Sequence, residues 1–162
     1  MYVRYIDRTR DYYLSKGYAR PYQWAHFEDV PFTRLSKPLS ECRVVLVSTS
    51  EIAERGTDGP EADGHQSAGG VYSIPSDVPA ERLFSRTRSY DRGATTIDDV
   101  GAFYPTTWLH EAVSSGRIKS LTSRFQGVYN TYSQRHTRER DCPEALRRCR
   151  EDGADVAILT SI

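Results

Sequence analysis

The sequence predicts an α/β fold, a single domain over residues 1–162 with a parallel or mixed sheet flanked by helices in Rossmann-like or flavodoxin-like layering. Residues 44–47 are apolar at every position, as in a central parallel strand covered on both faces. A second apolar run, residues 155–162, follows a helical segment directly. A length of 162 residues suits one hydrophobic core.

Composition limits the partners and the compartment. The 22 basic and 22 acidic residues cancel, so no net field attracts nucleic acid or an anionic membrane, and a small neutral or zwitterionic partner is expected. No apolar run is long enough to cross a membrane, and the first residues have no signal-peptide core, which predicts a cytoplasmic protein. Three cysteines, Cys42, Cys142 and Cys149, are an odd number, which favours reduced thiols over a disulfide framework.

The first helix is expected within residues 2–18, because Tyr2, Ile6 and Tyr13 recur at helical spacing and Lys16-Gly17 is a typical end. Residues 19–41 contain three prolines, which break a long helix, so this aromatic-rich stretch is expected to be extended and to lie across the core as a belt.

The middle of the chain is predicted to be irregular. Residues 55–70 form a glycine-rich polar loop, either a lid or a disordered connector, and the composition favours the connector. A short strand is expected at 71–75, a short helix capped by Ser76 or Asp77 over 76–85, and an extended piece over 86–91.

Two later helices have clearer signals. The first spans residues 105–116, with Pro105 in its first turn and Gly116 at its end. Its predicted apolar face comprises Trp108, Leu109, Ala112 and Val113. In the second, residues 141–153, Asp141 and Glu144 have the spacing of a capping box and Gly153 is the stop. Its predicted apolar stripe comprises Cys142, Ala145, Leu146 and Cys149. It leads directly into the terminal strand, which is predicted to be buried.

Common catalytic and cofactor motifs are absent. The chain has no Gly-x-Ser-x-Gly elbow, no phosphate-binding Gly-Lys-Ser/Thr loop, no Gly-x-Gly-x-x-Gly and no Cys-x-x-Cys. Its four histidines do not have the spacing of a metal site. Serine hydrolases, P-loop enzymes, common dinucleotide folds and zinc ribbons are therefore disfavoured, and neither a cofactor nor a metal is expected.

Two groups of residues are candidates for chemistry. His26, in an aromatic run, could serve in acid–base work, although a structural histidine is the more frequent interpretation of a single imidazole. In an extended segment Arg86, Arg88 and Tyr90 would share one face, where an arginine fork could hold a substrate carboxylate. An ordinary charged edge strand explains the same residues equally well.

Four segments resemble, in order, the selenoprotein B family of glycine, sarcosine and betaine reductases and the related D-proline reductase subunit. They are "PYQWAHFEDVPFTRLSKPLSECRVVLVSTSEI", "YSIPSDV", "YDRGATTIDDVGAFYPTTWLHEAVSSGRIKSL" and "EDGADVAILTSI". The most specific parts are Lys37-Pro38-Leu39-Ser40 leading into "RVVLVST", and the helix unit of residues 105–121. The resemblance implies a scaffold on which a selenolate or thiolate, just past the strand resembling "DVAILTS", reductively cleaves a carbon–nitrogen bond.

The sequence ends about where that redox motif should start, so the expectation is a short form without its own selenocysteine or cysteine nucleophile. A second possibility is a selenoprotein whose reading stopped at a selenocysteine codon. Where family members carry histidines, this chain has Arg86 and Arg88 and, further on, Arg124. The pocket is therefore expected to have changed its substrate.

These observations favour a small-molecule enzyme acting on an amino-acid-like or other carboxylate-bearing substrate. Its pocket is expected just beyond the 44–47 strand. Expected catalytic residues are His26, Glu51 and Tyr90, and expected substrate-binding residues are Ser48, Thr49, Arg86, Arg88, Asp91 and Arg124. The alternative is a non-catalytic subunit or small-molecule binding module completed by a partner chain, and either form could be a homo-oligomer.

Overall fold

The computed structural model describes residues 4–20, 26–29, 33–56, 69–88, 90, 92–93 and 95–161. Its internal contacts divide the chain into two compact units, Met1–Arg34 and Leu35–Ile162, and we describe each by itself. All strands of the described residues belong to the second unit. The protein has the predicted α/β class, and its sheet is mixed.

The first unit contains the predicted helix, α1, Tyr5–Ser15. It ends as expected at Lys16 and Gly17, where glycine adopts a φ of 82° that closes the helix. None of its described side chains is buried. The predicted belt falls partly outside the described residues, and those described at 26–29 and 33–38 form neither helix nor strand. A short 3₁₀ turn, η1, Leu39–Glu41, leads into the sheet.

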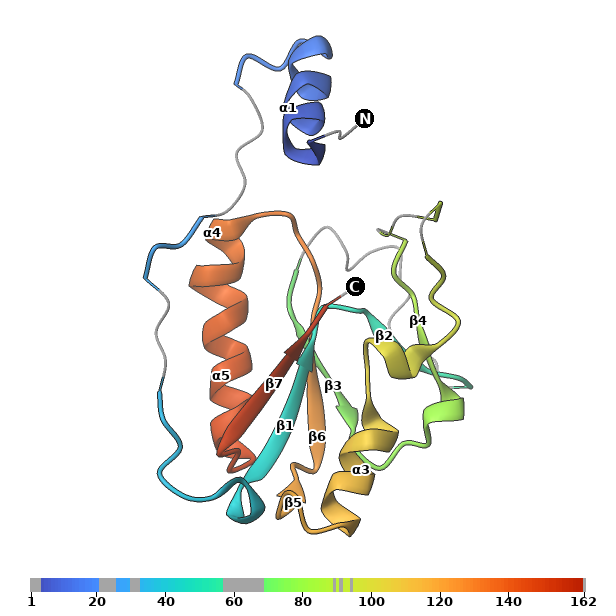
Figure 1. Ribbon diagram of the computed structural model, residues 1–162, viewed down its shortest axis with the longest axis vertical. Helices are drawn as coiled ribbons and strands as arrows, with labels where there is room; N and C mark the ends of the chain where they lie inside the picture. The colour runs from blue at the N-terminus through green and yellow to red at the C-terminus, as the bar shows by residue number, and fades with distance from the viewer. Residues whose placement is uncertain are drawn as a thin grey trace. The chain divides into compact units, whose positions relative to one another are not determined.

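The main sheet of the second unit has β1, Arg43–Ser48, at its centre (Figure 1). On one side β1 pairs with β7, Val156–Thr160; on the other it pairs with β5, Ser120–Leu121, and then with β6, Arg124–Val128. These pairs are all parallel, whereas β3, Val71–Pro75, runs antiparallel to β6. The strands predicted at 44–47 and 71–75 are therefore confirmed.

The terminal strand is present, but the prediction that it is buried is wrong. Among the described strands β7 pairs with β1 alone, so it forms an edge of the sheet. Its residues alternate between half-buried and exposed, and Leu159 is 77% exposed. An apolar run that suggests a covered strand can also occur at an edge, because local composition does not reveal whether a helix covers it.

The segment between β3 and the next helix also differs from expectation. The predicted helix over 76–85 is replaced by a single 3₁₀ turn, η2, Ala80–Arg82, followed by β4, Leu83–Ser85. β4 pairs antiparallel with β2, Ile52–Glu54, in a small second sheet. Ser76 does not cap a helix; its hydroxyl donates instead to the carbonyl of Thr122 at 2.5 Å.

Helix α3, Thr106–Ser114, confirms the first of the two later helices, and a 3₁₀ turn, η3, Val100–Ala102, precedes it. Leu109 is buried as expected, whereas Trp108 is 65% exposed and lies outside the core. The prediction for Trp108 is wrong because only Thr106 and Leu109 of this helix are buried. Figure 1 shows α3 and the small sheet on one side of the main sheet, with the last helices on the other.

The last helix begins earlier than predicted. It is one continuous run made of α4, Gln134–His136, a π-helical turn, Thr137–Asp141, and α5, Cys142–Glu151. Asp141 is therefore inside the helix and makes no capping bond, so the predicted capping box is wrong. Ser133 provides the N-terminal cap, its hydroxyl oxygen accepting the His136 N–H at 3.2 Å.

The core fixes the ends of the parallel strands. Val45, Leu46 and Phe125, from the centres of β1 and β6, are fully buried, and Tyr104 packs edge-on against Phe125 with ring centroids 6.1 Å apart. Each large apolar side chain removed from water contributes about 1.5–3 kcal/mol. The carboxyl ends of β1 and β6 are thereby held in place as a platform for the residues that follow them.

Candidate functional site

Strand β1 ends in a tight turn of hydroxyl side chains at the carboxyl edge of the sheet. The Ser48 hydroxyl donates to Ser50 Oγ at 2.8 Å and accepts the Ser50 N–H at 3.2 Å. The next residue, Glu51, is only 6% exposed and has a φ of 50°, in the left-handed region. Non-glycine residues in this region cost about 1–3 kcal/mol and gather at functional sites. Ligands of open α/β sheets also bind at this edge.

Two tyrosines stack beside this turn. Tyr72 on β3 and Tyr129, just past β6, have ring centroids 4.7 Å apart, and the Tyr72 hydroxyl oxygen accepts the Ile52 N–H at 2.6 Å. Burial raises the pKa of Tyr72 far above its usual range, and burial also raises the pKa of Tyr129. Both phenols are therefore neutral at physiological pH and available as hydrogen-bonding groups.

Gly127 makes this stacking possible. It faces Tyr72 across the β3–β6 pair, and a Cβ at this position would overlap ring carbons of Tyr72, closer than the 3.0 Å below which real contacts essentially do not occur. The bare backbone of Gly127 thus lets the Tyr72 ring lie flat against β6.

Arg86 joins the turn to the tyrosines. Its backbone N–H donates to the Glu51 carbonyl at 3.0 Å, and its guanidinium lies 5.6 Å from the Phe84 ring centroid. The positive charge of Arg86 opposes the rise in the Tyr129 pKa, whereas the negative charge of Glu51 adds to it, so both charges act on this phenol. The Arg86 guanidinium and the Glu51 carboxylate therefore both act electrostatically on the neutral Tyr129 phenol at the carboxyl edge.

The structure thus brings together four of the residues predicted for the site: Ser48, Thr49, Glu51 and Arg86. Arg88, two residues beyond Arg86, is exposed, and the buried Thr87 separates the two. This alternation agrees with a shared face for the two arginines. Tyr90 is half-buried, and the Arg92 guanidinium lies 5.5 Å from its ring centroid.

The remaining predicted residues are not placed at this edge. Arg124 begins β6, at the amino end of the parallel strands, where it pairs with Asp152 at 2.9 Å. In the parallel register of β1 and β6 Ser48 faces Gly127, so Arg124 lies three residues earlier along β6, where Asp152 engages its guanidinium. Its assignment as a binding residue stays a prediction. His26 belongs to the first unit, which is described separately, and Asp91 lies outside the described residues.

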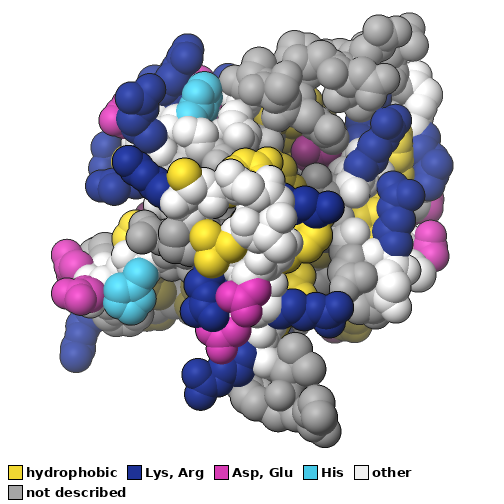
Figure 2. All heavy atoms as spheres, turned by 90° about the horizontal axis from the view of Figure 1, so that it is seen from above, with side chains coloured by type: hydrophobic (Ala, Val, Ile, Leu, Met, Phe, Trp, Pro, Cys, Tyr) yellow, Lys and Arg dark blue, Asp and Glu magenta, His cyan; other side chains and the backbone are white. Residues whose placement is uncertain are grey.

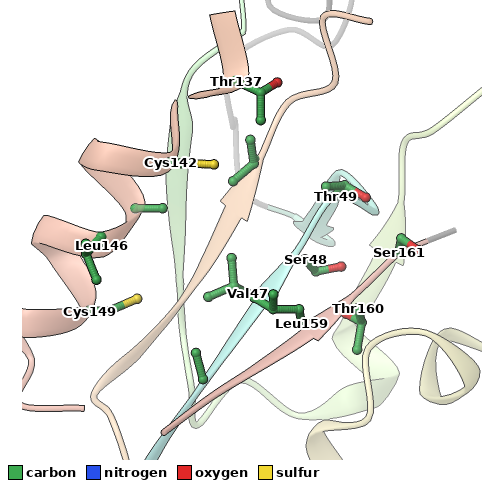
Figure 3. A pocket seen from close by; sticks show the side chains of 13 residues that line it. Val47, Ser48, Thr49, Thr137, Cys142, Leu146, Cys149, Leu159, Thr160 and Ser161 are labelled. Carbon is green, nitrogen blue, oxygen red and sulfur yellow. The ribbon is translucent and has the colours of Figure 1, made fainter. Parts of the chain in front are cut away.

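An apolar groove of about 470 Å³ lies between α5 and the sheet (Figure 3). Its lining includes Val47, Leu146 and Leu159, and Ser48 and Thr49 lie at its upper end. Figure 3 shows the Cys149 sulfur directed toward it. Burial raises the pKa of the Cys149 thiol, which keeps it protonated and unreactive, in agreement with a packing role.

Asp141 and His136 are the residues that the sequence prediction missed. They approach each other to 3.3 Å beside Gly70, whose carbonyl accepts the Tyr129 N–H at 3.0 Å. The sequence pattern indicates a helix cap for Asp141, and His136 has no second histidine at the spacing of a metal site. The signal that could have revealed them is Ser133, a cap residue three positions before His136, which moves the helix start upstream.

Comparison of the chain with models of protein families, with curated proteins and with solved structures found no match. Within the part of the chain that the structure describes, no three His, Cys, Asp or Glu side chains gather where they could hold a metal ion. No described helix has the length and apolar character needed to span a membrane.

Proposed function

We propose that this chain is an enzyme that binds a small, amino-acid-like carboxylate at the carboxyl edge of its sheet, derived from the selenoprotein B type of reductase that its sequence resembles. The observation that carries the proposal is that Arg86 and Glu51 both act electrostatically on Tyr129 at this edge. The reaction proposed is carbon–nitrogen bond chemistry or a related step.

The three side chains suit a zwitterion. The Arg86 guanidinium can give two parallel hydrogen bonds to a carboxylate, and the neutral Tyr129 phenol can donate a third. Glu51 supplies the negative charge that complements an amino or ammonium group. Figure 2 shows basic side chains in several groups on this face, with fewer acidic ones. Over the whole chain 22 basic and 22 acidic residues cancel, and this balance supports a small partner rather than a nucleic acid.

The free thiols of the three cysteines suit a reducing compartment, so we also propose a cytoplasmic location. Cys42 is buried at the start of β1 and serves as packing in this proposal.

The test is ligand binding measured by calorimetry with glycine, betaine and D-proline, comparing the wild-type protein with Arg86→Gln. Removing a charged hydrogen-bonding group costs about 1.5–3 kcal/mol, so affinity is expected to fall roughly 10- to 150-fold. Arg82→Gln is the matched control, because Arg82 lies in the same segment but pairs with Glu54 at 2.7 Å on the surface. The proposal would be refuted if Arg86→Gln bound the ligands as tightly as the wild type does. It would also be refuted if the wild-type protein bound none of the three carboxylates.

A second candidate function is a subunit completed by a partner chain. The supporting observation is β7, which among the described strands pairs only with β1 and carries the exposed Leu159. Such edges pair readily with other chains, either a second copy or a different subunit. Sedimentation of the wild-type protein and of Leu159→Lys tests this function. We expect the variant to lose an association that the wild type shows, and a strictly monomeric wild type would eliminate it.

A further inference from the structure

Asp141 is an almost fully buried carboxylate with an incomplete set of hydrogen bonds. Its side chain is 3% exposed. The Oδ1 atom accepts the Gly70 N–H at 3.1 Å and lies 3.3 Å from His136 Nε2. The Oδ2 atom is buried and has no hydrogen-bond partner among the described residues. A buried acceptor without a partner costs about 1–3 kcal/mol, so its persistence requires an explanation.

The helix changes its register at this pair. In an α-helix residues five apart point about 140° away from each other, because each turn takes 3.6 residues. The π-helical turn Thr137–Asp141 bonds residues five apart and brings His136 and Asp141 onto one side. Pro143 lies two residues after Asp141, and it cannot donate to the carbonyl four residues earlier, which favours the altered register. Such single π turns occur frequently at functional sites.

The backbone next to Gly70 also approaches the ring at Nε2. Gly69 has a φ of 72°, and a Cβ there would lie 2.6 Å from His136 Nε2 and 2.6 Å from a Thr131 methyl group. Only glycine satisfies both the conformation and this approach. Nε2 of His136 is therefore enclosed by Gly69 and Asp141 together.

The pair has the form of an oriented acid–base group. The carboxylate is buried, whereas the His136 side chain keeps 23% of its surface exposed and can be reached from outside. Because Nε2 faces Asp141, the other ring nitrogen, Nδ1, is directed away from the carboxylate. A buried carboxylate beside one imidazole nitrogen orients the ring, so that the other nitrogen is presented for proton exchange.

We propose that His136 is the proton-transfer residue of the site at the carboxyl edge and that Asp141 is its positioning residue. This inference rests on the proposed function, because the ligand is the carboxylate proposed there. Gly70 connects the pair to that site: its N–H donates to Asp141 and its carbonyl accepts the Tyr129 N–H. Neutral His136 takes a proton from the bound molecule on Nδ1 and becomes an imidazolium, whose charge the Asp141 carboxylate offsets. The reverse step returns the proton to the product, so no electrons are exchanged.

The test uses diethyl pyrocarbonate, which acylates an unprotonated imidazole nitrogen, with the rate at each histidine read by peptide mass spectrometry. Loss of an orienting carboxylate commonly costs 10-fold or more, so Asp141→Asn is expected to slow the reaction at His136 about 10-fold when both proteins are compared above about pH 8, where an ordinary imidazole is unprotonated. Asp152→Asn is the matched control, since this carboxylate pairs with Arg124 and Gln126 and not with a histidine. An unchanged rate overturns the proposal. A faster rate also overturns it, because Asp141 would then only keep the segment closed.

A measurement on the wild-type protein covers the case in which Asp141→Asn does not fold. His136 is expected to react faster than His110, which lies on exposed helix surface and bonds the Ser76 carbonyl at 2.7 Å through Nε2. A slower reaction at His136 contradicts activation by Asp141.

Betaine separates this proposal from the proposed function, because it carries a carboxylate and no amine that would consume the reagent. Protection of His136 by betaine in the wild type, and loss of protection in Arg86→Gln, supports a shared site. If Asp141→Asn slows acylation of His136 but betaine does not protect His136, the carboxylate site is refuted and the acid–base pair stands. If betaine protects His136 but Asp141→Asn does not slow its acylation, the acid–base pair is refuted and the binding site stands.

Discussion

The close contact between Gly127 and Tyr72 gives a sharp prediction for Gly127→Ala. The added methyl group cannot fit, so the Tyr72 ring must move away from β6. That movement breaks the bond between the Tyr72 hydroxyl and the Ile52 N–H, now 2.6 Å, and separates the ring from Tyr129. Overpacking costs about 1–3 kcal/mol and a lost hydrogen bond about 0.5–1.5 kcal/mol, which together predict a destabilisation of about 2–4 kcal/mol.

Urea denaturation measures this effect, and the midpoint is expected to fall by about 1–2 M at an m-value of about 2 kcal/mol/M. A double-mutant cycle identifies the cause: in a Tyr72→Ala background the ring is gone, so Gly127→Ala should then cost little. Gly101→Ala is the control, since its Cβ would meet only the flexible Asp99 side chain at 3.1 Å. Equal costs of Gly127→Ala in the two backgrounds would refute the reasoning.

Two further predictions concern charged residues away from the proposed site. Hydrogen bonds from Arg147 and Arg148 lower the pKa of Glu144 to about 2, so its stabilising effect is present above pH 4.5 and is lost as the pH falls toward 2. Glu144→Gln should therefore unfold more readily than wild type at pH 7, and the difference should shrink as the pH falls toward 2 and be smaller in high salt; a difference at pH 2 as large as at pH 7 would contradict this. Arg124→Gln should cost up to about 1 kcal/mol in urea denaturation, because its pair with Asp152 is partly exposed, while betaine binding measured by calorimetry stays unchanged. Weaker betaine binding in Arg124→Gln would mean that the site extends to the amino end of the sheet.

Some of the candidate site was accessible from sequence because its residues follow a strand directly. The apolar run at residues 44–47 predicted a central parallel strand, and the carboxyl end of such a strand is a general position for ligands. Ser48 and Glu51 were chosen by this route. Arg86 was chosen because alternation in an extended segment places it on one face with Arg88 and Tyr90.

Other residues were misinterpreted because their roles depend on distant segments. Asp141 has the local pattern of a helix cap, yet its carboxyl group bonds Gly70, which is 71 residues away in the sequence. Arg124 was assigned to the pocket by its place in the resemblance, but in the structure it begins β6 and pairs with Asp152, the residue that follows α5. Neither contact can be recognised from the residues that neighbour Asp141 or Arg124 in the sequence.

The sequence by itself determined the class of the fold, its central strand and three of its helices, because these depend on periodicity and on caps within a few residues. Only the tertiary structure decided that β7 is an exposed edge, that Gly127 receives the Tyr72 ring, and that Gly69 and Asp141 together enclose Nε2 of His136. The physical reason is the same in each case. Burial, ring stacking and the pairing of a carboxylate with an imidazole are set by contacts between segments far apart in the chain, whereas hydrophobic patterning reports only on neighbours.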